Sequence, residues 1–207
     1  IPNLQGNDEG EKIASIIRND MWLSGYFRVV SSSGIEKFAE KEGISVEQIR
    51  FDYWTSIEAQ ALVKGEVSRE HGDIVITIRL FDTFNHEMLV GKQYKADEKH
   101  IREVAHRFSD EIMEALTGIR GVFNTKITYA AQTGKGDKQI YTMDMDGHNP
   151  TALTKNKAIN ISPSWSPDGS QILFTSYMKG SPDLYTVTAG KNDYKKIKRY
   201  LIVIYCN

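Results

Sequence analysis

The stretch ISPSWSPDGSQILFTS, from Ile161 to Ser176, contains two side chains that could act as nucleophiles, Ser166 and Ser170. Nucleophilic catalysis by serine needs a general base, a group that orients the base, and hydrogen-bond donors for the oxyanion. No histidine lies near these serines in the sequence, and the hydrolase pattern G-x-S-x-G is absent from the chain. We therefore favour a structural interpretation of the stretch over a catalytic one.

The same stretch predicts a strand, a tight turn and a second strand. Pro167 fixes φ at the first corner, Asp168 caps the turn, and Gly169 tolerates a positive φ. We expect Pro163 to mark the start of the first strand and Trp165 to fill the gap between neighbouring twisted sheets. The predicted structural repeat motif consists of Pro163, Trp165, Ser166, Pro167, Asp168 and Gly169.

Other candidate sites are weak. No histidine has the partner that H-E-x-x-H requires, and the segment TGKGDKQ has Gln139 where a phosphate-binding loop needs its third glycine. The DMDG segment, Asp144–Gly147, lacks the later acidic ligand of a calcium loop and is better explained as a hairpin turn. The sequence predicts no catalytic residue, metal site or cofactor. The five histidines are His71 and His86 in predicted hairpin loops, His100 and His106 six apart on a predicted helix, and His148.

Composition excludes some classes of protein. The 207 residues carry 26 Lys and Arg against 27 Asp and Glu, a net charge of -1, so no basic field indicates nucleic-acid binding. No apolar run reaches the ~18 residues of a membrane span. The single cysteine, Cys206, excludes an internal disulfide. Because the chain opens on Ile1, we expect either that a leader was removed or that the sequence begins inside a gene.

The first half predicts helices around an antiparallel sheet. We expect helices over residues 7–24 with Asp8 as N-cap, over 35–42 and over 45–50, a strand over 26–30, and a turn over 31–34. Three β-rich runs between 61 and 96 indicate a meander. A helix over 97–116 has Asp97 as N-cap and Gly118 as C-cap. Trp22 and Trp54 are expected in the core.

These elements predict an α+β two-layer domain over residues 1–120, with helices on one face of the sheet. After Gly121 the pattern becomes all-β and repeats: KITYAAQ matches QILFTSY at an offset of 45, and QIYTMD matches DLYTVT at 44. That spacing is typical of propeller blades. Residues 121–207 are therefore predicted to form about two blades of an incomplete β-propeller, with a β-hairpin solenoid as the alternative.

Two segments resemble the TolB family. SWSPDGSQILFTS is similar to the blade motif of TolB-type propellers, and LTGIRGVFNTKITYAAQT, Leu116–Thr133, resembles the segment that joins the family's two domains. The family is also resembled by the upstream segment IRNDMWLSGYFRVV and by the order of the predicted helices and strands. The resemblance implies a non-enzymatic protein of the Tol-Pal system in the periplasm, which maintains the outer membrane during division. It further implies that the propeller binds the Pal lipoprotein and that the N-terminal region engages TolA.

The chain departs from that family pattern toward its end. Residues 126–207 number 82, whereas even four blades need about 160–180 residues, so we expect open strand edges, marginal stability or dimerisation by edge pairing. The final run, YLIVIYCN, does not continue the repeat and is prone to aggregation. Two alternatives therefore stay open: the gating propeller of a serine peptidase without its hydrolase domain, and a non-functional gene product.

Overall fold

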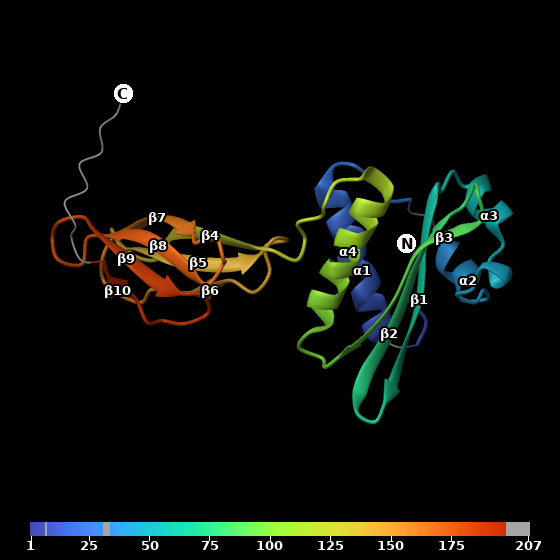
Figure 1. Cartoon of the computed structure of the whole chain (residues 1–207), viewed down its shortest axis with the longest axis horizontal. Coiled ribbons are helices and arrows are strands. Elements are labelled where there is room, and N and C mark those ends of the chain that lie inside the picture. Colours follow the sequence, from blue (N-terminus) through green and yellow to red (C-terminus); the bar gives the residue numbers. More distant parts are fainter. Residues whose placement is uncertain (7, 31–33, 198–207) are drawn as a thin grey trace. The chain divides into compact units, whose positions relative to one another are not determined.

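The computed structural model describes residues 1–6, 8–30 and 34–197, and the chain divides into two compact units, unit 1 (Ile1–Asn124) and unit 2 (Thr125–Asn207). Figure 1 shows helices and a sheet in unit 1 and strands alone in unit 2. This order confirms the predicted α+β region followed by propeller-type sheets. The expected turn over 31–34 falls largely outside the described residues, and the tail from Tyr200 falls wholly outside them.

Unit 1 contains α1 (Asp8–Ser24), α2 (Ile35–Ala39), the 3-10 helix η1 (Val46–Gln48), α3 (Phe51–Ser56), β1 (Ala61–Glu70), β2 (Asp73–Asp82), β3 (Glu87–Ala96) and α4 (Ile101–Thr117). Residues 26–30 form no strand, which corrects the prediction. The expected cap positions also shift, because Asp8 is already the first helical residue and α4 begins four residues after Asp97. The Asp97 carboxylate instead accepts hydrogen bonds from the backbone of Lys99 and His100 in the preceding turn.

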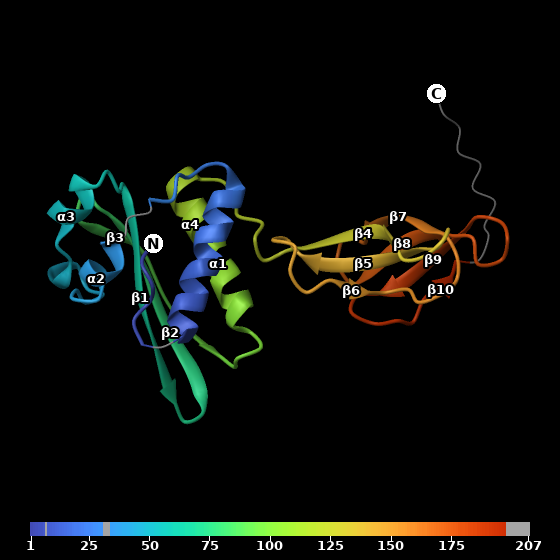
Figure 2. The same ribbon diagram turned by 180° about the vertical axis from the view of Figure 1, so that it is seen from behind.

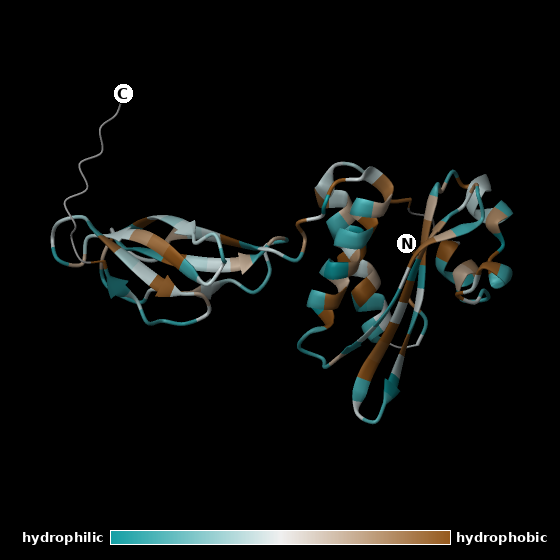
Figure 3. Cartoon of the chain, viewed as in Figure 1, coloured by the Kyte–Doolittle hydropathy of each residue, from teal (hydrophilic) through white to brown (hydrophobic). Residues whose placement is uncertain are grey.

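The sheet is the predicted antiparallel meander, in the order β1-β2-β3. Its main core lies against α1 and α4, which cover one face (Figures 1 and 2). The alternation of β2 supplies this core, because every second side chain points to the same face. Figure 3 shows the resulting apolar band along β2. The buried residues of β2 on this face are Ile74, Ile76, Ile78 and Leu80.

The opposite face carries a second, smaller core, which corrects the expectation of helices on one face only. Trp54 of α3 is 1% exposed and packs with Leu62 of β1 and Phe81 of β2. The segment that holds α2, η1 and α3 therefore adds a partial third layer. Ser45 and Gln48 form the capping box that the sequence predicted at η1.

Trp22 contradicts the prediction that it lies in the core, because 69% of its surface is exposed. The reason is helical geometry: Ile13, Ile17 and Met21 form the buried stripe of α1, and the residue after Met21 points about 100° away from that stripe. Trp54, in contrast, is buried as predicted.

Unit 2 contains two antiparallel sheets. Sheet B has the order β4-β5-β6, from β4 (Lys126–Gln132), β5 (Lys138–Asp144) and β6 (Thr151–Ala152). Sheet C has the order β10-β9-β8-β7, from β7 (Asn160–Trp165), β8 (Gln171–Ser176), β9 (Asp183–Thr188) and β10 (Lys195–Lys196). Pro163 lies inside β7 at a break in the register with β8, so it marks a bulge and not the predicted strand start.

The sequence repeat corresponds to repeated geometry. Tyr129 pairs with Tyr141 across β4 and β5, and the two rings stack with centroids 5.6 Å apart. Their counterparts Phe174 and Tyr185 pair across β8 and β9 and stack at 5.8 Å. The hairpin β4–β5 is therefore the structural equivalent of β8–β9. Among the described residues, no helix is long and apolar enough to cross a membrane.

Candidate binding surfaces

A cleft of about 830 Å³ opens in unit 1 at the end where α1 and α4 terminate. Its floor is apolar and includes the buried side chains of Met21, Leu62 and Ile112. Its rim includes two aromatic residues, Tyr26 and Phe84, each 61% exposed. An apolar cleft with exposed aromatic residues at its mouth has the composition of a protein or peptide binding surface.

One wall of this cleft is a free strand edge. The carbonyl of Gln60 accepts a hydrogen bond from the N–H of Thr83. The backbone N–H and C=O groups of even-numbered residues in β1 therefore point toward β2, and those of odd-numbered residues point away from it, to the outer edge of the sheet. Gln5 occupies part of the outward edge: its N–H donates to the carbonyl of Gly65 (2.8 Å), and its carbonyl accepts from Val67 (2.8 Å). Among the described residues, the outward backbone groups of β1 residues 61 and 63 have no strand partner, and both residues line the cleft.

Charged residues stand at the mouth of the cleft. Arg28 and Glu58 form an ion pair at 3.3 Å, and both side chains are about four-fifths exposed (79% and 81%). A pair so exposed contributes little to stability. Either side chain can therefore leave the pair and bind a charged group of a ligand with little loss of folding free energy.

A buried carboxylate fixes the second core beneath the cleft. Glu42 accepts hydrogen bonds from Trp54 Nε1 (3.0 Å) and from the backbone N–H of Arg50 (2.8 Å). Its other near neighbour is Lys64, whose Nζ lies 3.7 Å away and donates to the carbonyl of Ala39 (2.7 Å). Burial lowers the pKa of Lys64, and the Glu42 carboxylate opposes that shift. These bonds are structural and orient Trp54 at the floor of the cleft.

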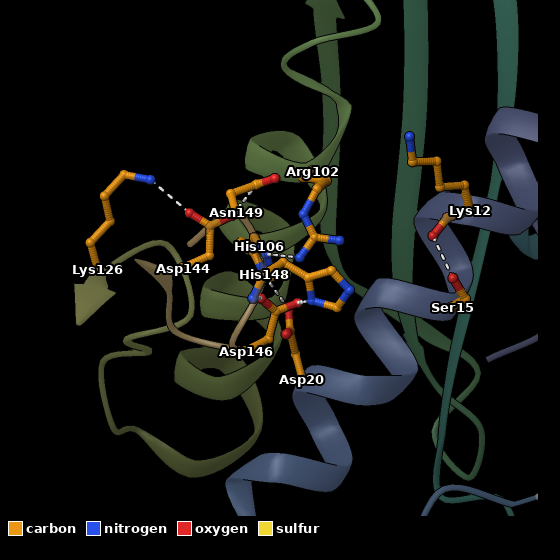
Figure 4. Close-up of polar contacts among 10 residues, drawn as sticks. All are labelled: Lys12, Ser15, Asp20, Arg102, His106, Lys126, Asp144, Asp146, His148 and Asn149. Atoms are coloured by element: carbon orange, nitrogen blue, oxygen red, sulfur yellow. Dashed lines mark hydrogen bonds and ion pairs between the residues drawn. The ribbon is translucent and has the colours of Figure 1, made fainter. Parts of the chain in front are cut away.

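A second polar cluster joins α1 to α4 (Figure 4). Nδ1 of His106 and a carboxylate oxygen of Asp20 lie 2.8 Å apart, and both side chains are buried. The histidine was predicted only as one of two residues six apart on a helix, and its contact with Asp20 spans 86 residues of sequence. One turn further along α4, Asp110 accepts hydrogen bonds from the backbone of Phe123 and Asn124, which holds the end of unit 1 against the helix. Burial raises the pKa of Asp110.

The predicted repeat motif forms a turn in which both serines are occupied. Ser166 and Ser170 donate their hydroxyl hydrogen bonds to the Asp168 carboxylate, at 2.5 Å and 2.8 Å. The N–H of Gly169, at φ 69°, donates to the carbonyl of Ser166. These bonds hold the pKa of Asp168 at about 2. The half-buried Trp165 packs against the core between the sheets, whose members are Ile140, Leu153, Ile172, Phe174, Tyr185 and Val187.

The other candidate residues also have local roles. His71 and His86 adopt a positive φ in the two hairpin turns, and His86 stacks on Phe51 with ring centroids 4.6 Å apart. His100 lies 2.7 Å from the carboxylate of Asp97. His148 lies 3.2 Å from an Asp146 carboxylate oxygen.

The turn from Asp144 to Gly147 closes on itself. The N–H of Gly147 donates to the carbonyl of Asp144 (2.9 Å), and the Asp144 carboxylate accepts from Lys126 and Asn149 (Figure 4). This is the hairpin turn that the sequence indicated.

The binding features of unit 1 were not found from the sequence. Tyr26, Phe84 and the outward edge of β1 come from three separated segments, and no spacing rule connects them. A signal did exist for Trp22, which falls off the apolar stripe of α1 and is exposed. Tyr26 lies beyond the end of this helix, so the helical stripe gives no signal for it.

Fold and surface together define a class: an α+β domain with an open peptide-sized cleft, followed by propeller-type sheets. Two family models match the chain, the TolB amino-terminal domain over residues 1–89 and the TolB beta propeller domain over residues 130–200. The chain belongs to the TolB family. The match of an amino-terminal TolB domain favours this family over the peptidase alternative.

The relatives support that assignment. The chain is 36% identical over 179 residues to the Tol-Pal system protein TolB of Desulfosudis oleivorans, with 86% of this chain and 41% of that protein covered. It is 35% identical to the same protein of Bordetella pertussis, covering 86% and 40%. A crystal structure of TolB from Acinetobacter baumannii shares the fold, with a TM-score of 0.82 at 22% identity, over 95% of this chain and 48% of that one. The chain thus spans about two-fifths of the length of these curated relatives.

Proposed function

We propose that this chain is a periplasmic, non-enzymatic binding component of the Tol-Pal system, which helps to maintain the outer membrane and its constriction during division. Membership of the TolB family and the names of the relatives support a place in that system. The cleft of unit 1 is the observation that carries the binding role. It offers an apolar floor and unpaired backbone groups, which together suit an extended segment of a protein partner.

TolA and the Pal lipoprotein are the proposed partners, as the family resemblance implies. We assign TolA to unit 1, because the resemblance places its contact in the N-terminal region. Pal is assigned to unit 2. Neither assignment needs a cofactor, since both are protein–protein contacts.

The test is direct binding of the chain to the purified periplasmic regions of TolA and Pal, measured by titration calorimetry. Phe84→Ser removes an exposed aromatic side chain from the rim and should weaken TolA binding about tenfold or more. Trp22→Ser makes a similar change at an exposed position outside the cleft and should leave binding unchanged. If Phe84→Ser and Trp22→Ser have equal effects, the cleft is not the contact. If neither protein binds the unmodified chain, the proposed function is wrong.

A further inference from the structure

A polar joint connects the two sheets of unit 2, and Asn160 of β7 lies at its centre. The Asn160 side chain is fully buried, and its Nδ2 donates to the carbonyl of Lys138 in β5 (2.8 Å) and to Oδ1 of Asn156 (2.9 Å). Two further acceptors, Oε1 of Gln139 and the carbonyl of Ala158, lie at 3.2 and 3.3 Å. Because four acceptors surround this atom, it must be the amide nitrogen, and Oδ1 is the other polar atom of the group.

The same reasoning orients the side chain of Asn156. The atom that faces the Asn160 nitrogen accepts a hydrogen bond, so it is Oδ1, and Nδ2 points elsewhere. The backbone of Asn156 is held by Gln139, whose Oε1 accepts from the Asn156 N–H (3.3 Å) and whose Nε2 donates to the Asn156 carbonyl. Neither asparagine amide can therefore be reversed without placing two donors or two acceptors face to face.

This arrangement leaves one acceptor and one donor without a partner. Oδ1 of Asn160 and Nδ2 of Asn156 are both buried, and neither has a hydrogen-bond partner among the described residues. Buried polar groups nearly always have a partner, and an ordered water commonly supplies it where the protein does not. A cation would be repelled by the donor and an anion by the acceptor. The group that fits here is neutral and both donates and accepts a hydrogen bond.

Trp165 of β7 provides a comparison within the same unit. Its Nε1 is also buried and has no partner in the described part of the chain, and the ring packs against the apolar core between the sheets. A buried water needs at least two polar partners and typically makes about three hydrogen bonds. One indole N–H beside apolar side chains does not meet that need. The Asn156–Asn160 pair does, because it offers a donor and an acceptor on two side chains that are bonded to each other.

We propose that unit 2 binds one ordered water molecule at the Asn156–Asn160 pair. The water donates to Oδ1 of Asn160 and accepts from Nδ2 of Asn156. It adds two hydrogen bonds to the joint that holds residues 154–160, between β6 and β7, against β5. Because both atoms are closed to solvent, the water leaves only when the joint opens, so it stays bound far longer than water on the surface.

The first test is a crystal structure of the full 207-residue chain. We expect a water molecule within about 2.7–3.2 Å of both Asn160 Oδ1 and Asn156 Nδ2. The absence of a water at this place overturns the proposal. So does a reversed amide at either asparagine that finds all its partners within the protein.

The second test counts long-lived internal waters in solution by ¹⁷O magnetic relaxation dispersion. Asn156→Leu removes both polar atoms from a side chain of similar size and should lower the count by one. Trp165→Phe removes the isolated N–H and is the matched control, which should leave the count unchanged because an apolar cavity stays dry. Circular dichroism establishes that each variant is folded.

Two outcomes of this count contradict the proposal. One is an unchanged count in folded Asn156→Leu, and the other is an equal loss in Trp165→Phe. If Asn156→Leu does not fold, the crystal structure of the unmodified chain decides the question alone.

Discussion

The two units solve the same problem, the covering of a β-sheet, with different completeness. In unit 1, helices α1 and α4 cover one face of the sheet, and the α2–α3 segment covers part of the other. In unit 2, two sheets share one small core, and within the described residues no strand pairs with the outer edge of β4. The difference shows that one sheet of a repeat protein buries its apolar face against a neighbouring sheet of the same kind. In a domain without repeats, helices of the same domain cover the sheet.

The largest expected effect tests whether unit 1 is held by its own two cores. Trp54→Ala removes a side chain that is 1% exposed and whose Nε1 donates to Glu42, so it should destabilise unit 1 by about 3–5 kcal/mol. Urea denaturation followed by circular dichroism measures this. Trp22→Ala is the matched control and should cost less than about 0.5 kcal/mol, because that ring is exposed. Equal costs at the two tryptophans would refute the assignment of Trp54 to a core.

The next effect concerns the polar joint between the two sheets of unit 2. Asn160 of β7 is fully buried, and its Nδ2 donates to the carbonyl of Lys138 (2.8 Å) and to Asn156 Oδ1 (2.9 Å). Asn160→Ala leaves these partly buried acceptors with fewer partners and removes a fully buried polar side chain, so it should destabilise unit 2 by about 1–3 kcal/mol. Ser164→Ala, at an exposed residue of the same strand, is the control. No difference between the two variants would mean that the joint does not hold the sheets together.

A smaller effect is expected where α4 ends. Gly118 has φ 72°, a left-handed conformation that costs an alanine about 1 kcal/mol, although its surroundings leave room for a Cβ atom. Gly118→Ala should therefore destabilise unit 1 by about that amount in the same denaturation experiment. Gly134→Ala also has room and lacks a positive φ, so it should have no such cost. A larger loss at Gly134 would contradict this account.

The smallest effect is a pH dependence in unit 2. The hydrogen bonds from Ser166 and Ser170 lower the pKa of Asp168 to about 2 from an ordinary value of 3.8. Because the folded value is the lower one, the turn contributes stability above the ordinary pKa and loses it as the pH falls from about 4 toward 2. Asp168→Asn should remove this part of the pH dependence of unfolding. An unchanged acid profile in that variant would show that the carboxylate does not act in this way.

The sequence predicted those features whose causes are local. Period-two alternation identified β2, the Pro167-Asp168-Gly169 segment identified a turn, and self-similarity located the two hairpins. Its errors came from tertiary context. Residues 26–30 include strand-forming types, but they pair with no strand in the part of the chain that the structure describes.

The candidate surfaces could not be predicted in the same way. The cleft of unit 1 is assembled from segments as far apart as Tyr26 and Leu116, and hydrophobic periodicity carries no information about which segments meet. The free edge of β4 was predictable only in general terms, as an open edge. Its position required the register of β4 with β5 and of β7 with β8.

The difference between the outer edges of β4 and β8 is tested most directly by hydrogen exchange at two equivalent backbone amides. Thr128 of β4 and Leu173 of β8 occupy corresponding positions, and each has one neighbouring strand on its inner side. Among the described residues, only Leu173 also has a strand on its outer side, with Ser164 opposite it. In a dilute, monomeric sample we predict slow exchange at the amide of Leu173 and fast exchange at that of Thr128. Equal protection of the two amides in the monomer would contradict the claim that β4 has an open edge.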